Sequence, residues 1–296
     1  MKKHFLYGLL LIFGACALIL SGCSDDDDDD NNGIVNGDPN APEIMLMDGV
    51  MGEGALTMDG QIIGVSLALI NAIFEGGGAG KISADNAFED FITFDYAYDT
   101  ANYWHIFTCS IEVVDDDDFI RMVGTDSIRF TLGGYVYYPM GMPTDIDIRA
   151  HFDTDVEAEE AEVEFAQHAQ MALSDLSDLN EDMEPEEMVV NGSSIDTMDV
   201  TVTEIDGIDT TICDLFVTQT QTIVDIVIDT MVTYYDNCPL GGAINISANA
   251  SIGCVGEENF DITGLWTASF VFAEGGMTAT YETGNTRWTF TEDCRD

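Results

Sequence analysis

Alternation of apolar and polar residues with a period of two runs through most of the chain after residue 91, and it constrains the fold more than any other feature. In residues 145–153 the even positions are Ile146, Ile148, Ala150 and Phe152, and the odd positions are polar. The same pattern recurs in residues 224–234, 244–252 and 266–272. Such alternation is typical of a strand with one buried face and one face in water. Turn-forming Gly, Asp, Asn and Pro separate about eleven such segments.

Two segments depart from this pattern and predict helices. Residues 61–74 are apolar on nearly every side, follow Asp59 as a plausible N-cap and end in a glycine-rich stretch, which favours a buried helix; a buried strand pair remains an alternative. Between residues 156 and 179, a run of glutamates is followed by apolar residues at helical spacing, which favours a second helix. These residues are Phe165, Ala169, Ala172, Leu173 and Leu176. The predicted fold is therefore mainly β: an antiparallel β-sandwich or curved β-barrel of about eleven strands, with one or two packed helices.

A weak internal similarity suggests two related halves that divide near residue 185. Residues 125–132 (TDSIRFTL) resemble residues 283–290 (TGNTRWTF), and a tryptophan precedes each segment by a similar distance. Coincidence between two alternating hairpins is the alternative interpretation.

Charge excludes one class of partner. The chain carries 56 acidic and 8 basic residues, for a formal net charge of −48, while 46% of its residues are hydrophobic. That apolar content is enough to bury a core, so disorder of the whole chain is not expected. Nucleic acid is excluded as a partner, because neutralising phosphates requires clustered Lys and Arg.

The N-terminus carries a targeting signal. Lys2 and Lys3 precede an apolar run that ends in Leu20-Ser21-Gly22-Cys23. This arrangement resembles the lipobox of bacterial lipoproteins. The resemblance implies that residues 1–22 are a signal peptide and that Cys23 receives a diacylglycerol thioether, usually with a further acyl chain such as palmitate on its amino group. An uncleaved anchor is the alternative, but the apolar run is shorter than the roughly 20 residues that span a bilayer.

An acidic segment follows the lipidated cysteine. Asp25 to Asp30 are six consecutive aspartates, which repel one another and stay solvated, so residues 23–43 are expected to form a flexible tether. Ser24 after the cysteine resembles lipoproteins sent to the outer membrane, and the acidic run is similar to a surface-export signal of Bacteroidetes-type lipoproteins. We therefore expect an outer-membrane lipoprotein, facing either the periplasm or the outside, with a β-rich globular region over residues 44–296.

The cysteines fit an oxidising compartment. Besides Cys16 in the signal and Cys23, the chain has five cysteines, and four of them, Cys213, Cys238, Cys254 and Cys294, lie in its C-terminal third. One or two disulfides within this group are expected, with Cys109 as the free thiol; their connectivity does not follow from the sequence. Zinc is not expected, because the chain has neither C-x₂-C spacing nor a histidine near these residues.

Signatures of catalysis are missing from the sequence. It contains no G-x-S-x-G elbow, no phosphate-binding glycine loop and no H-E-x-x-H pair, and we expect no catalytic residues. His105 shares its strand face with Phe107 and Cys109, which favours a core histidine. His151 is expected on the wet face of its strand, and His168 on the second helix beside Phe165.

Calcium is the one cofactor that the residues suggest. Hard cations bind oxygen ligands, and carboxylates cluster in two places. These are one turn, with Asp115, Asp116, Asp117 and Asp118, and one strand face, with Asp145, Asp147 and Asp153. A weak structural calcium ion is expected at one of them, although solvated charge is the simpler interpretation.

Three functions remain. The first is a non-enzymatic lipoprotein that contacts proteins or glycans. The second is a carrier that holds a hydrophobic ligand between a curved sheet and the apolar helix. The third, less favoured, is a glycan-active enzyme that uses carboxylates and the aromatic residues Tyr96, Tyr98, Trp104, Tyr135 and Tyr137. No family is assigned to the mature region, and the sequence leaves its oligomeric state open.

Overall fold

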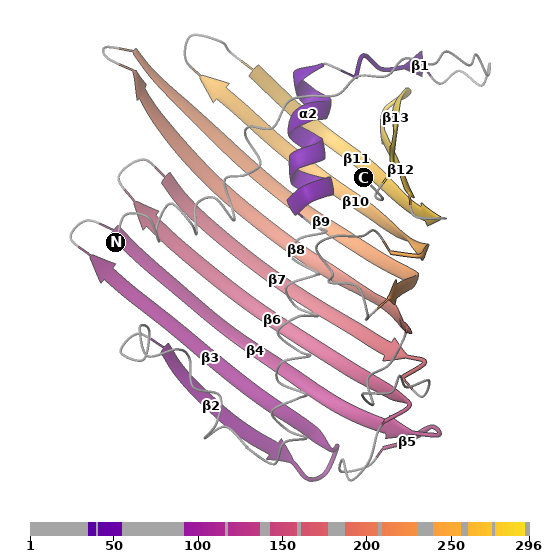
Figure 1. The fold of residues 1–296 in the computed structure, drawn as a ribbon. Coiled ribbons are helices and arrows are strands. Elements are labelled where there is room, and N and C mark those ends of the chain that lie inside the picture. Colours follow the sequence, from indigo (N-terminus) through magenta and orange to yellow (C-terminus); the bar gives the residue numbers. More distant parts are fainter. Residues whose placement is uncertain are drawn as a thin grey trace.

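Antiparallel strands make up most of the structure. The computed structural model describes residues 35–39, 41–54, 92–115, 118–136, 143–158, 161–176, 187–206, 209–229, 239–255, 260–273 and 276–293. Within these ranges thirteen strands form one sheet, in the order β1-β13-β12-β11-β10-β9-β8-β7-β6-β4-β3-β2, with β5 paired to β4 (Figure 1). Consecutive strands are hydrogen-bonded neighbours almost throughout, so the sheet is a meander.

Eleven of these strands have eight residues or more, and two are short. The long strands are β2 (Ile92–Asp99), β3 (Trp104–Asp115), β4 (Asp118–Leu132), β6 (Asp145–Ala158), β7 (Ala161–Ser174), β8 (Glu187–Asp206), β9 (Asp209–Asp229), β10 (Gly241–Val255), β11 (Phe260–Ala273), β12 (Gly276–Thr283) and β13 (Thr286–Asp293). The short ones are β1 (Val35–Asn36) and β5 (Tyr135–Val136). The predicted mainly β, antiparallel class and the number of strands are confirmed. The strands form a single curved sheet whose two edges do not pair with each other, so the sheet is open.

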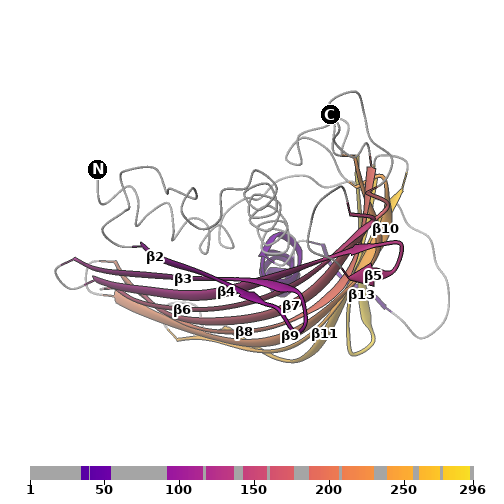
Figure 2. The same cartoon turned by 90° about the horizontal axis from the view of Figure 1, so that it is seen from below.

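One face of the sheet carries the core. Figure 2 shows the sheet curving around the short helix α2 (Pro42–Asp48), which continues as one turn of π-helix, η2 (Gly49–Gly54). We call the side that bears α2 the inner face and the opposite side the outer face. Ile44, Met47, Val50 and Met51 of this helical segment belong to one cluster of buried side chains with the inner face of the sheet. The helix expected at residues 61–74 lies outside the described residues.

The predicted strand faces are confirmed in β6, β10 and β11. The inward residues of β10, Ile244, Ile246, Ala248, Ala250 and Ile252, are all buried, while Asn245, Ser247, Asn249 and Ser251 between them are exposed. Register aligns such residues into rows across the sheet: Ile246 lies opposite Gln221 of β9 and Ala268 of β11.

The prediction of a helix between residues 156 and 179 is wrong. That region contains the end of β6, a hairpin and β7, in which Val163, Phe165, Ala169, Met171 and Leu173 are buried. Phe165, Ala169 and Leu173 are four residues apart, and a spacing of four fits both a helix and one face of a strand. Val163 and Met171 fit only the period of two, and tertiary pairing with β6 and β8 overrides the glutamate-rich helix signal.

A bulge interrupts the alternation in β9. The pairing of β9 shifts register against β8 between Val190 and Gly192, and against β10 between Gly241 and Ala243. Asp225 at this point has φ 49°, and Gly242 opposite has φ 104°. The extra residue moves Val224, expected on the core side, to the outer face, where it is 41% exposed, and Ile223 takes the buried place. Such a bulge bends the strand and increases its twist.

The N-terminal segment is joined to the last strand. β1 pairs with β13 in parallel, Gly37 N donates to the carbonyl of Arg287 over 2.8 Å, and Trp288 Nε1 donates to the carbonyl of Asp38 over 3.0 Å. We call this contact the terminal clasp. Residues 35–38, which belong to the expected tether of residues 23–43, are thus held against the last strand.

The two similar segments do not occupy equivalent positions. Residues 125–132 lie within strand β4, whereas residues 283–290 include the turn between β12 and β13. The sheet runs without a break across residue 185, because β7 pairs with β8 along fourteen residue pairs.

Candidate functional site

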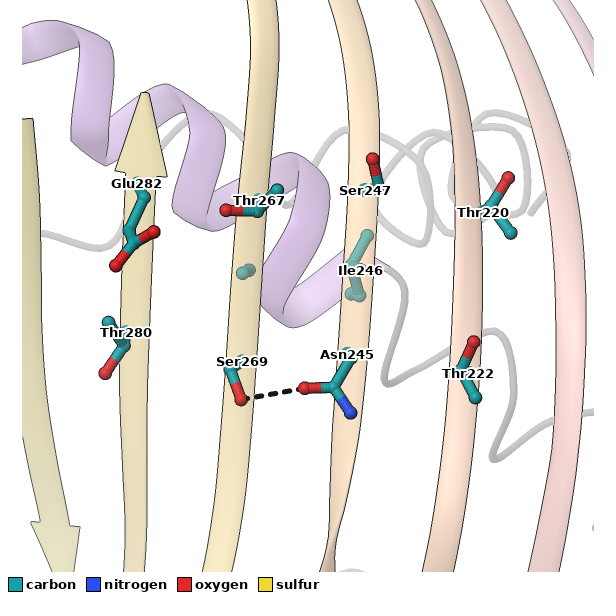
Figure 3. Close-up of a pocket in the computed structure, with 10 residues that line it drawn as sticks. Thr220, Thr222, Asn245, Ile246, Ser247, Thr267, Ser269, Thr280 and Glu282 are labelled. Carbon is teal, nitrogen blue, oxygen red and sulfur yellow. Dashed lines mark hydrogen bonds between the residues drawn. The ribbon is translucent and has the colours of Figure 1, made fainter. Parts of the chain in front are cut away.

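The outer face of β9–β12 contains a shallow polar hollow of about 420 Å³. Figure 3 shows its lining from the side opposite α2, with hydroxyl and amide side chains standing on neighbouring strands. The outward residues that line it are Thr220, Thr222, Asn245, Ser247, Thr267, Ser269, Thr280 and Glu282. We call this set the polar face. These side chains share one surface because each strand alternates and the register aligns Thr222, Asn245, Ser269 and Thr280 in one row.

The single charge of the polar face is balanced by a neighbouring residue on β13. This charge is the carboxylate of Glu282, which forms a short ion pair with Arg287 at 2.5 Å. Ser269 Oγ donates to Asn245 Oδ1 over 2.9 Å, which leaves the amide group of Asn245 directed outward (Figure 3). By contrast, the seven outward positions of β6 hold five carboxylates: Asp145, Asp147, Asp153, Asp155 and Glu157. The outer face of the same sheet is therefore strongly acidic on β6 and nearly free of carboxylates around the hollow.

The outer face also carries a cluster of basic and aromatic side chains on β3, β4, β6 and β7. Trp104 is 7% exposed and is covered by two guanidinium groups, those of Arg129 and Arg149, whose Cζ atoms lie 4.6 and 4.5 Å from its ring centroid. Asp147 accepts from Arg129 Nη2 over 2.6 Å and from Nε over 3.0 Å. Such stacking on tryptophan stabilises the cations and fixes their planes.

Two histidines complete this cluster. The rings of His151 and His168 stack with centroids 4.0 Å apart and an angle of 19° between their planes. His151 Nε2 lies 2.9 Å from Asp153 Oδ2, and its Nδ1 lies 3.3 Å from the carbonyl of Gln167. We call Arg129, Arg149, His151, His168 and the Trp104 ring beneath the arginines the arginine–histidine patch. The wet-face position of His151 is confirmed; His168 lies on a strand, on the face opposite Phe165, so its helical assignment is wrong.

The inner face contains a buried polar group of its own. Asp196 on β8 is 3% exposed and accepts from Gln219 Nε2 over 3.0 Å and from Ser194 Oγ over 3.3 Å. Burial raises the pKa of this carboxyl group, although hydrogen bonds from Gln219 and its other neighbours oppose the shift. The cluster lies in one row, because Gln167 and Gln219 are the register partners of Asp196.

His105 is a core residue, as its place on the strand suggested. It is completely buried on the inner face, where Tyr96 Oη lies 2.9 Å from its Nδ1 and Phe130 contacts its ring edge-on. Burial lowers its pKa to about 4. Its surroundings are aromatic and give it no access to a substrate in solution.

The aromatic residues proposed for a glycan-active enzyme do not form a common platform. Tyr96 and Tyr98 pack against His105 on the inner face, whereas Trp104 lies beneath the arginines on the outer face. Tyr135 of β5 is 80% exposed, and Tyr137 lies outside the described residues.

Neither predicted calcium site is assembled among the described side chains. Asp147 is bound by Arg129, Asp153 by His151, and Asp145 by Thr144, whose Oγ1 donates over 2.7 Å. In the described part of the chain no group of three or more His, Cys, Asp or Glu side chains could hold a metal ion. The side chains of Asp115 and Asp118, and all of Asp116 and Asp117, lie outside the description, so calcium at that turn stays a prediction.

A disulfide links two of the predicted cysteines. Cys213 of β9 and Cys254 of β10 are register partners and form a bond that spans 41 positions of sequence. Cys23, Cys238 and Cys294 lie outside the described residues. Cys109 is a free thiol whose pKa is raised, chiefly by burial. The disulfide indicates a location outside the reducing cytoplasm.

No protein-family model matches the chain, and no match was found among curated proteins or among solved structures. Among the residues that the structure describes, no helix is long and apolar enough to cross a membrane.

The arginine–histidine patch is not indicated by any pattern in the sequence. One signal was present: the chain has only five arginines, and two of them, Arg129 and Arg149, lie on strands that pair directly. The alternation in residues 244–252 indicates the part of the polar face that lies on β10. Which residues of the neighbouring strands join it depends on the register of the sheet.

Proposed function

We propose that this protein is a lipid-anchored lipoprotein of the outer membrane or cell surface that binds glycans, without catalysis, through the polar face. The observation that carries the proposal is the neutrality of this face in a chain with a net charge of −48. Thr, Ser and Asn side chains offer both donors and acceptors, which suit the hydroxyl groups of a sugar. A surface meant only to stay hydrated would carry the carboxylates that cover β6.

Asn245 provides the test of glycan binding. Asn245→Asp keeps the acceptor for Ser269 and adds a charge at the centre of the polar face, whereas Asn249→Asp makes the same change four residues along the same strand face. We expect Asn245→Asp to weaken binding to a panel of neutral oligosaccharides at least tenfold, and Asn249→Asp to change it less than twofold. A panel that the unmodified protein does not bind, or equal effects of the two variants, would contradict the proposal.

Lipid anchoring is supported by the lipobox and is compatible with the disulfide. The thioether on Cys23 would hold the folded part at the membrane with no spanning helix, because each buried methylene contributes about 0.8 kcal/mol. We expect the full chain to enter the detergent phase in a Triton X-114 partition and the Cys23→Ala variant to stay in the aqueous phase. Retention of Cys23→Ala in the detergent phase would point to another mode of attachment.

A carrier function is the second candidate, and the shape of the sheet favours it. The inner face is concave, carries most of the buried apolar side chains and is contacted by α2, an arrangement that suits a hydrophobic ligand. Native mass spectrometry of the protein released from its own membranes would detect a bound lipid as an added mass. The mass of the lipidated chain alone would count against this function.

A further inference from the structure

Arg149 is an exposed cation with no carboxylate partner among the residues that the structure describes. Arg129 on β4 and Arg287 on β13 each form an ion pair. Arg121, also exposed on β4, has none among the described residues either, but of these two unpaired arginines only Arg149 lies over a tryptophan ring. The carboxylate nearest to Arg149 along its strand face, that of Asp147, is held by Arg129. In so acidic a chain, a guanidinium without a carboxylate is an arrangement that a ligand can use.

The position of Arg149 prepares it for an anion. Its Cζ lies 4.5 Å from the centroid of the Trp104 ring. This cation–π contact places the group over an aromatic ring and engages no carboxylate, so its N–H donors can bind a carboxylate, sulfate or phosphate in a bidentate manner. Trp104 is 7% exposed and Arg129 lies over it as well, so the ring that supports Arg149 is itself packed.

The neighbours of Arg149 offer further donors. Its register partners are Ser127 on β4 and Gln170 on β7, and their side chains share the outer face with it. His168 is the next residue on the same face of β7, two positions from Gln170; it is exposed and stacks on His151. The two ring nitrogens of His151 lie close to Asp153 and to the carbonyl of Gln167. A hydroxyl, an amide and an imidazole therefore surround the guanidinium.

The site is continuous with the polar face. Register places Arg149, Gln170, Ser193, Thr222 and Asn245 in one row that crosses β6 to β10. Strands lie about 4.8 Å apart, so Arg149 and Asn245 are separated by about 19 Å. A ligand that reaches both must be extended and must carry hydroxyl groups along most of its length and an anion at one place.

We infer that the arginine–histidine patch is an oxyanion site, centred on Arg149, that selects glycans bearing a carboxylate or sulfate group. The inference rests on the proposed function in taking the anion to be part of a glycan bound along the polar face. Arg149 and its neighbours bind the oxyanion, and the hydroxyl and amide side chains from Ser193 to Thr280 contact the neutral part. The carboxylates of β6 repel polymers with dense negative charge, so the site favours ligands with few anions.

Calorimetry with the full chain in detergent tests this inference at 150 mM NaCl, where charges beyond about 8 Å are screened. The probes are a glucose hexamer with a single glucuronate residue at one end, a neutral glucose hexamer, free glucuronate and sodium sulfate. We expect the hexamer with the single glucuronate to bind at least tenfold more tightly than the neutral hexamer. Binding of free glucuronate or sulfate as tight as that of the anionic hexamer would contradict an extended ligand.

Arg149→Gln is the decisive variant, and Arg121→Gln is its matched control. Arg121 is an exposed arginine on the outer face of β4, and its replacement by Gln removes the same charge as Arg149→Gln. We expect Arg149→Gln to abolish the preference for the anionic hexamer, Arg149→Lys to restore part of it and Arg121→Gln to leave it unchanged. Equal losses in both Gln variants would reduce the effect to net charge and overturn the inference.

The glucose hexamer separates this inference from the proposed function. If the glucose hexamer binds and Arg149→Gln changes no affinity, the oxyanion site is wrong and the polar face remains a glycan surface. If only the anionic hexamer binds and Arg149 is required while Asn245→Asp has no effect, the oxyanion site stands and the proposed role of the polar face is wrong.

Discussion

The indole Nε1 of Trp288 donates a hydrogen bond to the main-chain carbonyl of Asp38, joining residues that lie 250 positions apart. The same ring stacks on Trp266 with centroids 5.5 Å apart. An added Cβ at Gly37 would lie 2.0 Å from Trp288 Cε2 and Nε1. The terminal clasp therefore depends on an indole that is held from both sides and on a residue without a side chain.

Two substitutions test the terminal clasp. Trp288→Phe removes the donor and should cost about 1 kcal/mol of unfolding free energy. Gly37→Ala should cost more, because the stacked indole cannot move aside without losing Trp266. Hydrogen exchange at residues 35–37 should accelerate in both variants, and Thr289→Ala, an exposed change on the same strand, should leave it unchanged. Unaltered exchange in Gly37→Ala would show that the clasp tolerates a side chain there.

Tyr281 should govern the docking of the helical segment. Its hydroxyl donates to Asp48 Oδ1 at the end of α2, and Asp48 lies 233 positions earlier in the chain. Tyr281→Phe keeps the ring and removes the donor, with an expected loss of about 2 kcal/mol for a hydrogen bond to a carboxylate. Chemical denaturation measures the loss, and faster hydrogen exchange at residues 42–48 locates it. A loss of stability without faster exchange there would place the effect elsewhere.

His105 should make the protein less stable in mild acid. Its pKa is lowered from 6.5 to about 4 in the folded state. Between these two pH values the imidazole is therefore protonated in the unfolded chain and neutral in the folded chain. Stability is then lost as the pH falls from 6.5 to about 4, on the order of 3 kcal/mol in full. His105→Phe should flatten this part of the pH profile of unfolding. Parallel profiles for the two proteins would refute the assignment.

Asp196 should destabilise the folded state at neutral pH. Its pKa is raised by burial, so the folded protein holds the proton more tightly than the unfolded one, and stability falls as the pH rises above 3.8, the ordinary value for the residue. Asp196→Asn keeps an acceptor for Gln219 and removes the charge. We expect Tm to rise at pH 7 and the gain to disappear at pH 3. A variant with lower Tm at pH 7 would instead show that the ionised carboxylate has a role in the fold.

The disulfide should contribute a large share of the stability. The Cys213–Cys254 bond closes a loop of 41 positions, for which chain entropy predicts a stabilisation of about 4 kcal/mol. The double variant Cys213→Ser, Cys254→Ser should show this loss in urea denaturation. Cys109→Ser, which removes the described free thiol, is the control and should lose far less. A double variant as stable as the parent would mean that the unfolded chain is already compact here.

The sequence predicted most of the strands well and their register poorly. The inward and outward residues of β10 follow from alternation alone, because Ile246 and Asn245 differ enough in polarity to decide which enters the core. β7 was misassigned, since Phe165, Ala169 and Leu173 satisfy both periods. The pairing of Cys213 with Cys254 depends on the register of β9 and β10, which alternation restricts to every second residue but does not determine.

The candidate site was less predictable than the fold. Trp104 and Arg149 are 45 positions apart and lie on strands separated by β4, so no local pattern connects them. The polar face has the same difficulty, because it takes its residues from four strands. Composition alone could have drawn attention to Arg149, since basic residues are rare enough in this chain for each to be examined.

The meander has a consequence for the order in which the protein acquires its structure. From β2 to β13 each long strand pairs with the long strand that immediately precedes it in the chain, so the sheet can grow strand by strand from its N-terminal side. The helical segment and residues 35–38 come early in the chain, yet their partners Tyr281 and Trp288 lie near its C-terminal end. Attachment of the N-terminal segment to the sheet can therefore be completed only after the last strands are in place.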